Sequence, residues 1–242
     1  MNSLKLKVLV VVPAWNEERS IGEVVMELRA NDFEVLVVDD GSSDNTSSIA
    51  KSHGALVVRL PMNLGVGAAL RCGFVFALRH GYDIVVQCDA DGQHPVAHIK
   101  HLVNTVRNNN VHMVIGSRFK ENAGAMHISF LRKVAMKILA QSATRATQTR
   151  ITDATSGFRA IKTPLLNELA VNLPSYYLGD TYEALVSAGR AGYRVVEISA
   201  PITERLHGTS SARRVTAIKL MSKALLSSVF RIHTRLAKSN DL

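Results

Sequence analysis

Two carboxylates and an amide stand at alternate positions of this sequence, at Asp89, Asp91 and Gln93. They follow a β-branched run at residues 84–86, which predicts a buried strand. Because alternate residues of an extended segment share a face, we expect the three side chains to converge if the backbone stays extended. Such a ligand set suits a hard cation, Mg²⁺ or Mn²⁺, that keeps positions open for phosphate oxygens. By itself Asp-x-Asp is more often a solvated turn, so the interpretation depends on the surrounding elements.

The chain before this motif alternates between apolar runs and amphipathic stretches. The runs predict strands that are apolar on both faces, separated by helices. This pattern is typical of an α/β domain with a parallel sheet and helices on both faces, in which ligands bind at the carboxyl ends of the strands. The predicted strands cover residues 7–12, 34–38, 56–60 and 84–86, and the predicted helices cover residues 18–30, 45–53 and 66–80.

The residues after the first two predicted strands suit a nucleoside. Trp15 can cover a ring, Glu17 can accept a hydrogen bond from a hydroxyl, and Asp39 can accept one from a base N–H. Neither loop carries a Gly-x-Gly-x-x-Gly fingerprint, and the chain has no Walker A sequence, so neither dinucleotide nor P-loop binding is indicated. For Ser-Ser-Asp at residues 42–44, a turn leading into a helix N-cap is the simpler explanation.

Composition limits the class of protein. The chain has 242 residues, of which 47% are hydrophobic, enough for one large α/β domain. Its two cysteines, Cys72 and Cys88, lie in apolar segments, so we expect reduced core residues of a cytosolic protein. The early apolar run is too short for a signal peptide, and no stretch approaches a membrane span, so we expect a soluble or peripheral protein.

Positive charge is concentrated toward the end of the chain. The sequence has 29 basic and 20 acidic residues, and residues 205–242 hold eight Lys or Arg against one acid, Asp241. This indicates an anionic partner, either nucleic acid, a phosphorylated substrate or a membrane surface. Aromatic residues make up only 5% and do not alternate with the basic ones, which argues against nucleic acid.

Eight motifs resemble, in order and spacing, those of inverting family 2 glycosyltransferases of the GT-A fold. The nearest branch is similar to dolichol-phosphate mannose synthase and other polyprenyl-phosphate glycosyltransferases, and the resemblance covers nearly the whole chain. The motifs are Val-Val-Pro-Ala-Trp-Asn-Glu-Glu (11–18), Val-Val-Asp-Asp-Gly-Ser-Ser-Asp (37–44), Asn-Leu-Gly-Val-Gly-Ala-Ala-Leu (63–70), Cys-Asp-Ala-Asp-Gly-Gln-His-Pro (88–95), Ile-Gly-Ser-Arg-Phe (115–119), Asp-Ala-Thr-Ser-Gly-Phe-Arg (153–159), Gly-Tyr-Arg-Val-Val-Glu-Ile (192–198) and Arg-Leu-His-Gly-Thr-Ser (205–210).

The resemblance implies roles for particular residues. Asp89, Asp91 and Gln93 would hold Mg²⁺ or Mn²⁺ on the diphosphate, where a cation offsets the charge that develops on the leaving nucleotide, which makes Asp91 a catalytic candidate. Arg118 and Arg205 match positions that approach the diphosphate or the acceptor, because a guanidinium fork suits phosphate oxygens. The nucleoside of an NDP-sugar would be held by Pro13, Trp15, Glu17 and Asp39 and by the backbone at Val37 and Ala90. For the acceptor phosphate, Arg132 is a further candidate, in a helix expected at residues 129–147.

Some positions depart from the family pattern. Trp15 stands where Tyr is common and should still stack on a base. The Arg-x-x-Gly motif continues as Gly-Thr-Ser-Ser at residues 208–211 instead of Gly-x-Ser-Lys, so a basic group is missing or is supplied by Arg213 or Arg214. His207 is either a late metal ligand or, like most lone loop histidines, a surface residue.

Residues 213–238 predict a basic amphipathic helix. Such a helix either lies on an anionic membrane or packs its apolar stripe on the catalytic domain or a second subunit, and the sequence does not separate these two possibilities. We therefore predict a GT-A catalytic domain at residues 1–212 and a basic helix and tail at residues 213–242. The stripe contains Ile218, Met221, Leu225, Val229, Ile232 and Leu236, and the opposite face contains Lys219, Lys223, Arg231, Arg235 and Lys238.

These features predict metal-dependent, inverting transfer of a sugar from an NDP-sugar to a polyprenyl phosphate. We expect a peripheral enzyme at the cytoplasmic face of the membrane, with homo-oligomers possible. Because the acceptor is already an anion, the reaction needs no general base. In one alternative the acceptor is a hydroxyl of a glycan or small metabolite, and Asp180 takes the proton, although a helix N-cap is the simpler role for it. In another the chain is a non-catalytic nucleotide-binding protein, against which the intact Asp89, Asp91 and Gln93 argue.

Overall fold

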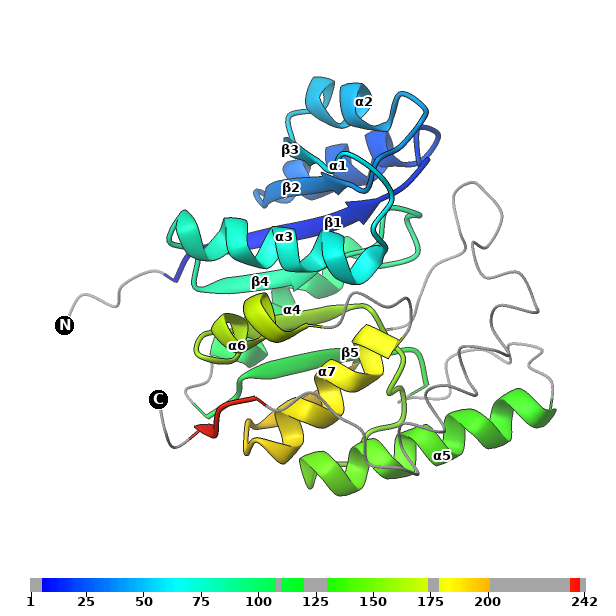
Figure 1. The fold of residues 1–242 in the computed structure, drawn as a ribbon, viewed down its shortest axis with the longest axis vertical. Helices are drawn as coiled ribbons and strands as arrows, with labels where there is room; N and C mark the ends of the chain where they lie inside the picture. The colour runs from blue at the N-terminus through cyan, green and yellow to red at the C-terminus, as the bar shows by residue number, and fades with distance from the viewer. Residues whose placement is uncertain (1–5, 108–109, 120–129, 174–178, 201–235, 240–242) are drawn as a thin grey trace.

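The computed structural model describes residues 6–107, 110–119, 130–173, 179–200 and 236–239, without the side chains of residues 130–133 and 179–180. Within this part of the chain, a seven-stranded sheet has the order β3-β2-β1-β4-β6-β5-β7 (Figure 1). Its strands are β1 (Val8–Ala14), β2 (Glu34–Asp39), β3 (Leu56–Arg59), β4 (Ile84–Gln87), β5 (Met113–Ser117), β6 (Arg159–Lys162) and β7 (Val195–Ser199).

The first four strands are parallel, as the alternation of strands and helices predicts. β1 pairs with β2 and β4, and β2 pairs with β3. β6 is the exception, because it lies antiparallel between β4 and β5, while β5 and β7 are parallel to each other. Two antiparallel pairings in succession restore the original direction. The carboxyl ends of β1 to β5 and β7 therefore meet at one edge of the sheet, together with the amino end of β6.

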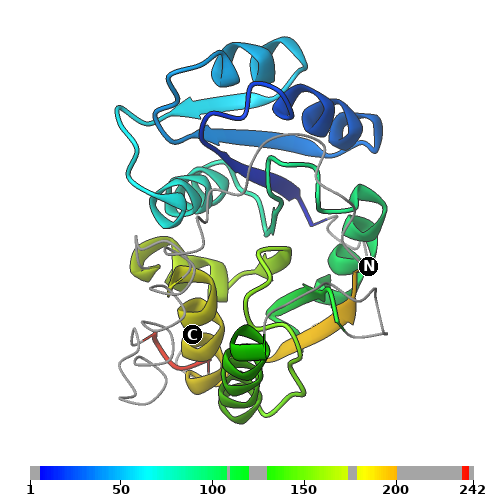
Figure 2. The same cartoon turned by 90° about the vertical axis from the view of Figure 1, so that its right-hand side faces the viewer.

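Helices cover both faces of the sheet (Figures 1 and 2). Side chains alternate across each strand, so Val11 packs under one set of helices and Val10 under the other. The first face carries α3 (Val66–Arg79), α5 (Phe130–Thr147), α6 (Leu165–Asn172) and α7 (Gly179–Arg190), and the second carries α1 (Ile21–Ala30), α2 (Thr46–Ser52) and, after a short 3₁₀ turn at Val96–His98, α4 (Ile99–Arg107).

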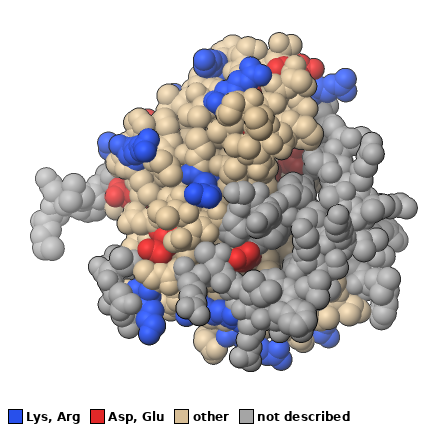
Figure 3. Space-filling view, viewed as in Figure 1, with Lys and Arg blue, Asp and Glu red and all other residues tan. Residues whose placement is uncertain are grey.

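Basic side chains of the described residues are dispersed over the face of the molecule in Figure 3. In Figure 3 the Lys and Arg side chains lie apart from one another over the face shown. The concentration of charge in the sequence, at residues 205–242, falls almost wholly outside the described residues. In the part of the chain that the structure describes, no helix is long and apolar enough to cross a bilayer.

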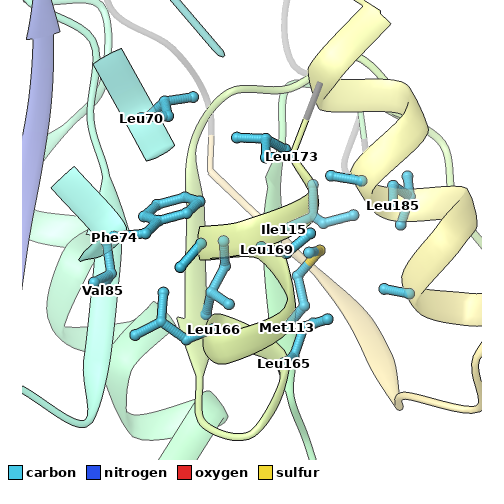
Figure 4. Close-up of a cluster of buried hydrophobic side chains, with 14 of the residues drawn as sticks. Leu70, Phe74, Val85, Met113, Ile115, Leu165, Leu166, Leu169, Leu173 and Leu185 are labelled. Atoms are coloured by element: carbon cyan, nitrogen blue, oxygen red, sulfur yellow. The ribbon is translucent and has the colours of Figure 1, made fainter. Parts of the chain in front are cut away.

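The buried side chains between the sheet and α3, α5, α6 and α7 form the first hydrophobic cluster, in which α3 packs closely against β1. Gly73 permits this approach, because a Cβ there would lie 2.4 Å from Val11 Cγ1. Figure 4 shows part of this cluster, where side chains of α3, α6 and α7 meet over the sheet. Both cysteines are free thiols, as predicted, with Cys88 buried and Cys72 half-buried.

The end of the chain packs on the domain. Leu236 contacts the first hydrophobic cluster, the Ala237 N–H donates to Glu168 Oε2 at 2.9 Å, and the Ser239 N–H donates to the Ala191 carbonyl at 2.9 Å. Residues 236–238 are not helical, so the helix predicted at residues 213–238 does not extend to Lys238. The physical reason is that these backbone N–H groups bond to the domain instead of to carbonyls four residues earlier. The rest of the predicted helix lies outside the described residues.

Candidate active site

Polar side chains join the loops that follow β1 and β2. The Asn16 N–H donates to Ser42 Oγ at 2.9 Å, the Ser43 N–H donates to Asn16 Oδ1 at 2.8 Å, and the Glu17 N–H donates to Thr46 Oγ1 at 2.9 Å. Asn16 has φ 56°, a left-handed conformation that Asn tolerates better than most residues. Ser42 and Ser43 therefore bond across to the other loop instead of only forming the turn before α2, which the sequence favoured.

Asp39 lies at the carboxyl end of β2 and is fully buried. Its carboxylate accepts hydrogen bonds from the Ser42 N–H, at 2.8 Å, and from the Ser47 hydroxyl. Arg59 Nε lies 3.8 Å from Asp39 Oδ2, and 57% of the Arg59 side chain is exposed. Burial by itself raises the pKa of Asp39, but the bonds from Ser42 and Ser47 and the charge of Arg59 outweigh burial and lower it. Because Asp39 has no exposed surface, a nucleotide base can contact its carboxylate only if a neighbouring side chain moves, and Arg59 is the exposed neighbour.

Arg59 and Asp40 are two residues of this region that sequence reasoning missed. Arg59 ends β3 directly opposite Asp39, a position that depends on the strand register. Asp40 accepts hydrogen bonds from the N–H groups of Leu64 and Gly65, each at 2.8 Å, and so fixes the loop before α3. An acidic residue after a strand was the available signal, but its partners lie 24 and 25 residues away.

The other predicted nucleoside residues lie along the same edge. Trp15 follows β1 with 48% of its surface exposed, which suits a stacking role. Pro13, the second-to-last residue of β1, is half-buried. The Glu17 carboxylate accepts from the Ser20 hydroxyl at 2.8 Å. Val37 pairs with Val12 and Val57 inside the sheet, two residues before the edge, and Ala90 is buried after β4.

The backbone after β4 turns instead of staying extended. Gly92 has φ 75°, and Asp91 Oδ1 accepts the Gln93 N–H at 3.0 Å, which closes a tight turn. The extended backbone that was the condition for convergence of the three side chains is therefore absent here, because Asp-x-Gln around a left-handed glycine favours this turn. Asp91 is buried with 7% exposure, whereas 44% of the Asp89 side chain is exposed.

His94, to which the sequence assigned no role, holds Asp89. Its Nδ1 accepts the Asp89 N–H at 2.9 Å, and its Nε2 lies 3.5 Å from Asp89 Oδ2. Because Nδ1 is the acceptor, the neutral ring carries its proton on Nε2, facing the carboxylate. The ring stacks on Phe158 with a centroid distance of 4.7 Å. The side chain of Asp89 is therefore held in place from its own loop.

The Asp89 carboxylate is accessible to a bound group, because 44% of its side chain is exposed. A Cβ at Gly157 would lie 3.3 Å from Asp89 Oδ1 and 3.2 Å from Gln87 Nε2, closer than most real Cβ contacts, so glycine lets the chain before β6 approach Asp89 closely. Across the described ranges, no three His, Cys, Asp or Glu side chains gather as a metal site. Two carboxylates are the ligand type of a hard cation that takes its remaining ligands from phosphate oxygens and water, so the chemistry of Asp89 and Asp91 suits such an ion. Gln93 stays a prediction as its third protein ligand.

Arg118 follows β5 at the same edge and pairs with Asp153. Nε donates to Asp153 Oδ2 at 2.6 Å, and Nη2 donates to Asp153 Oδ1 at 2.7 Å. The sequence analysis predicted that Arg118 binds a substrate phosphate. In the structure, Nε and Nη2 of its guanidinium bond to Asp153 instead. The side chain keeps 22% exposure, so a ligand can still reach it.

Several predicted residues have side chains outside the described set. Arg132 lies in the first turn of α5, and Asp180 is the second residue of α7, but neither side chain is described. Arg205 and His207, like Arg213 and Arg214, fall outside the described residues altogether. The structure therefore brings together the residues that follow β1, β2, β4 and β5, and the roles of these other residues stay predictions.

Comparison with known proteins gives this site a context. The family model "Glycosyl transferase family 2" matches residues 9–170. An undecaprenyl-phosphate mannosyltransferase of Micrococcus luteus is 30% identical over 85% of this chain and 87% of its own. A UDP-N-acetylglucosamine–dolichyl-phosphate N-acetylglucosaminyltransferase of Methanococcus voltae is 29% identical over 79% of this chain and 83% of its own.

The fold also matches solved structures. Glucosyl-3-phosphoglycerate synthase of Mycobacterium tuberculosis, in complex with Mn²⁺, UDP and glucosyl-3-phosphoglycerate, superimposes with a TM-score of 0.67. It is 21% identical, and the match covers 93% of this chain and 79% of that one. The mostly parallel sheet with helices on both faces is therefore a GT-A domain, as the motifs predicted.

Proposed function

Because the chain belongs to glycosyl transferase family 2, we propose that this glycosyltransferase moves a sugar from an NDP-sugar to a polyprenyl phosphate, with inversion. The observation that carries the proposal is Asp89 at the carboxyl end of β4, held by His94 and with 44% of its side chain exposed. An anchored, exposed carboxylate suits the diphosphate end of the donor with its cation. Membership in an enzyme family argues against a non-catalytic nucleotide-binding protein.

The donor nucleoside would lie over the ends of β1 and β2. Trp15 offers an exposed ring for stacking, and Glu17 offers a carboxylate to a ribose hydroxyl. Asp39 would accept a base N–H once the exposed Arg59 side chain moves aside. Pro13, Ala90 and the end of β2 after Val37 would form the walls.

Asp89 and Asp91 would hold Mg²⁺ or Mn²⁺ against the donor diphosphate. When bound, the cation would offset the negative charge that develops on the leaving nucleoside diphosphate. The protein's own part is to hold both carboxylates in place, Asp89 through the His94 contact and Asp91 through the turn at Gly92. The Mn²⁺ and UDP named for the mycobacterial structure support this assignment.

The acceptor would be a lipid phosphate at the cytoplasmic face of the membrane. Both relatives described above are named for lipid-phosphate acceptors, undecaprenyl and dolichyl phosphate. A phosphate oxygen is already a nucleophile, so no side chain has to remove a proton. Arg118, with Arg132 and Arg205, would bind the acceptor or donor phosphates.

A donor screen tests this function. Purified protein would be mixed with UDP- and GDP-hexoses and Mn²⁺, first in a thermal-unfolding assay and then with undecaprenyl phosphate in detergent. The correct donor at about 100 times its Kd should add about 2.7 kcal/mol to the free energy of unfolding. We expect one donor to give both this stabilisation and a lipid-phosphate sugar product. Stabilisation by a donor without any lipid product would reject the acceptor while keeping the donor site.

A hydroxyl acceptor is the second candidate, because the acceptor named for the mycobacterial structure is a phosphoglycerate and not a lipid phosphate. Asp180 would then be the general base. Asp180→Asn should leave most activity if the acceptor is a lipid phosphate, whereas loss of a required base costs about 10²–10⁴-fold. Initial rates with saturating donor would measure the effect. Glu183→Gln, one turn later in α7, is the matched control for removing a carboxylate from this helix.

A further inference from the structure

A buried carboxylate on β7 lies behind the site. Glu197 is 4% exposed in a strand that otherwise contains Val, Ile and Ser. Its carboxylate accepts three hydrogen bonds from consecutive residues of the loop after α5: from the Thr152 N–H at 2.6 Å, the Thr152 hydroxyl at 2.8 Å and the Asp153 N–H at 3.0 Å. A buried charge is costly unless such donors surround it. Glu197 therefore fixes the backbone at Thr152 and Asp153.

The loop in turn fixes Arg118. Asp153 is 1% exposed, and its two oxygens meet Nε and Nη2 of Arg118 side by side. Nη2 also donates to Thr155 Oγ1 at 2.9 Å, and the Arg118 N–H points to Asp153 Oδ2 at 3.3 Å. None of these hydrogen bonds, all of which join described residues, involves Nη1 of Arg118. The fork thus determines the direction in which Nη1 is presented.

A second hydroxyl ties this network to β5. Ser117 Oγ lies 2.9 Å from Thr152 Oγ1 and accepts the Phe119 N–H at 3.2 Å. The end of β5 and the loop that carries Asp153 are therefore connected by the Ser117–Thr152 contact as well as by the Arg118–Asp153 pair.

The charge of Arg118 interacts with Asp89 as well as with Asp153. Burial by itself lowers its pKa, but the hydrogen bond and charge of Asp153 and the charge of Asp89 outweigh burial and raise it. A permanently charged fork close to Asp89 suits the phosphate groups of substrates.

We propose that Glu197 is a positioning residue for sugar transfer: it fixes Thr152 and Asp153, and through Asp153 it sets the direction of the Arg118 guanidinium toward a substrate phosphate. This inference rests on the proposed function. Glu197 is buried, so in this proposal it acts on the substrate through Asp153 and Arg118 and not by direct contact. The phosphate belongs either to the donor diphosphate or to the acceptor, and the kinetic constants distinguish these sources.

A double-mutant cycle tests the proposal. Glu197→Gln keeps the shape but turns an N–H₂ group toward the loop's N–H donors, and it should lower kcat/KM by about 10–100-fold, as loss of a supporting contact does. In an Arg118→Gln background the same change should cost less than about twofold, because its target is already absent. A rise in acceptor KM assigns the phosphate to the acceptor, and a rise in donor KM assigns it to the donor. Glu168→Gln, a carboxylate at the opposite edge that accepts the Ala237 N–H, is the matched control and should not change the kinetics.

Two further measurements keep the test decisive. Thr152→Val removes the hydroxyl that bonds Glu197, and Thr152→Ser retains it, so Val should lose about fivefold more activity than Ser even if Glu197→Gln folds poorly. Trp15, the one tryptophan of the chain, reports UDP binding by fluorescence and confirms that the nucleotide end of the site is intact. Equal losses from Glu197→Gln with and without Arg118, or equal activity of the two Thr152 variants, would overturn the proposal. If wild-type protein makes no lipid-linked sugar, the proposed acceptor is wrong, and the cycle is then measured on NDP-sugar hydrolysis.

Discussion

Replacing Asp91 by Asn is expected to lower sugar transfer by about 10²–10³-fold, the usual cost of removing one electrostatic stabiliser. The amide keeps an oxygen that can accept the Gln93 N–H, so the turn around Gly92 should survive. What is lost is the negative charge available to the cation on the donor diphosphate. We expect an unchanged thermal unfolding midpoint, together with weaker Mn²⁺ binding in the presence of UDP. Transfer rates and calorimetric titration of Mn²⁺ would measure the two effects.

The matched control is a substitution at the other end of β4. Asp83 precedes β4 and accepts the Lys7 N–H at 2.8 Å, far along the strand from the carboxyl edge. Asp83→Asn makes the same chemical change and should leave transfer near the wild-type rate. Activity that survives both Asp91→Asn and an excess of EDTA would show that the cation has no part in the reaction.

The sheet was predictable because its determinants are local. Strands that are apolar on both faces, separated by amphipathic helices, identify a parallel sheet, and the first four strands follow this pattern within a few residues. β6 was not predicted, because its four residues, Arg-Ala-Ile-Lys, carry no run of apolar residues. Its antiparallel insertion between β4 and β5 depends on long-range pairing alone.

The sequence predicted which residues belong to the candidate site, but it did not predict their hydrogen-bond partners. Asp89 follows a predicted strand, so its place at the carboxyl edge could be inferred from the topology, whereas Arg118 was assigned to the site only by the family resemblance. The partner of Asp89 could not be inferred, because His94 reaches it through a turn, and the sequence analysis considered contacts of Asp89 only for an extended backbone at this segment. Likewise Glu197 bonds Asp153 across 44 residues, and neither its hydrogen bonds nor its burial has a local signature.

The basic tail has the second large expected effect. Near an anionic surface each Lys or Arg contributes about 1 kcal/mol, so four substitutions by Gln should weaken vesicle binding by about 4 kcal/mol, or about 10³-fold. Substitution tests this better than truncation, because truncation would also remove Leu236, Ala237 and Ser239, which contact the domain. The substituted residues are Lys219, Lys223, Arg231 and Arg235.

Co-sedimentation with vesicles containing an anionic phospholipid would measure this binding at low and physiological salt. The attraction should fall with salt, since the Debye length is about 8 Å at physiological ionic strength. A control variant replaces four exposed basic residues of α2, α3 and α4 and should retain most binding, because these helices lie on opposite faces of the sheet and their charges do not face one surface together. If wild-type protein fails to bind at low salt, or if both variants lose binding equally, the tail is not a membrane anchor and packs on protein instead. The control residues are Lys51, Arg79, Lys100 and Arg107.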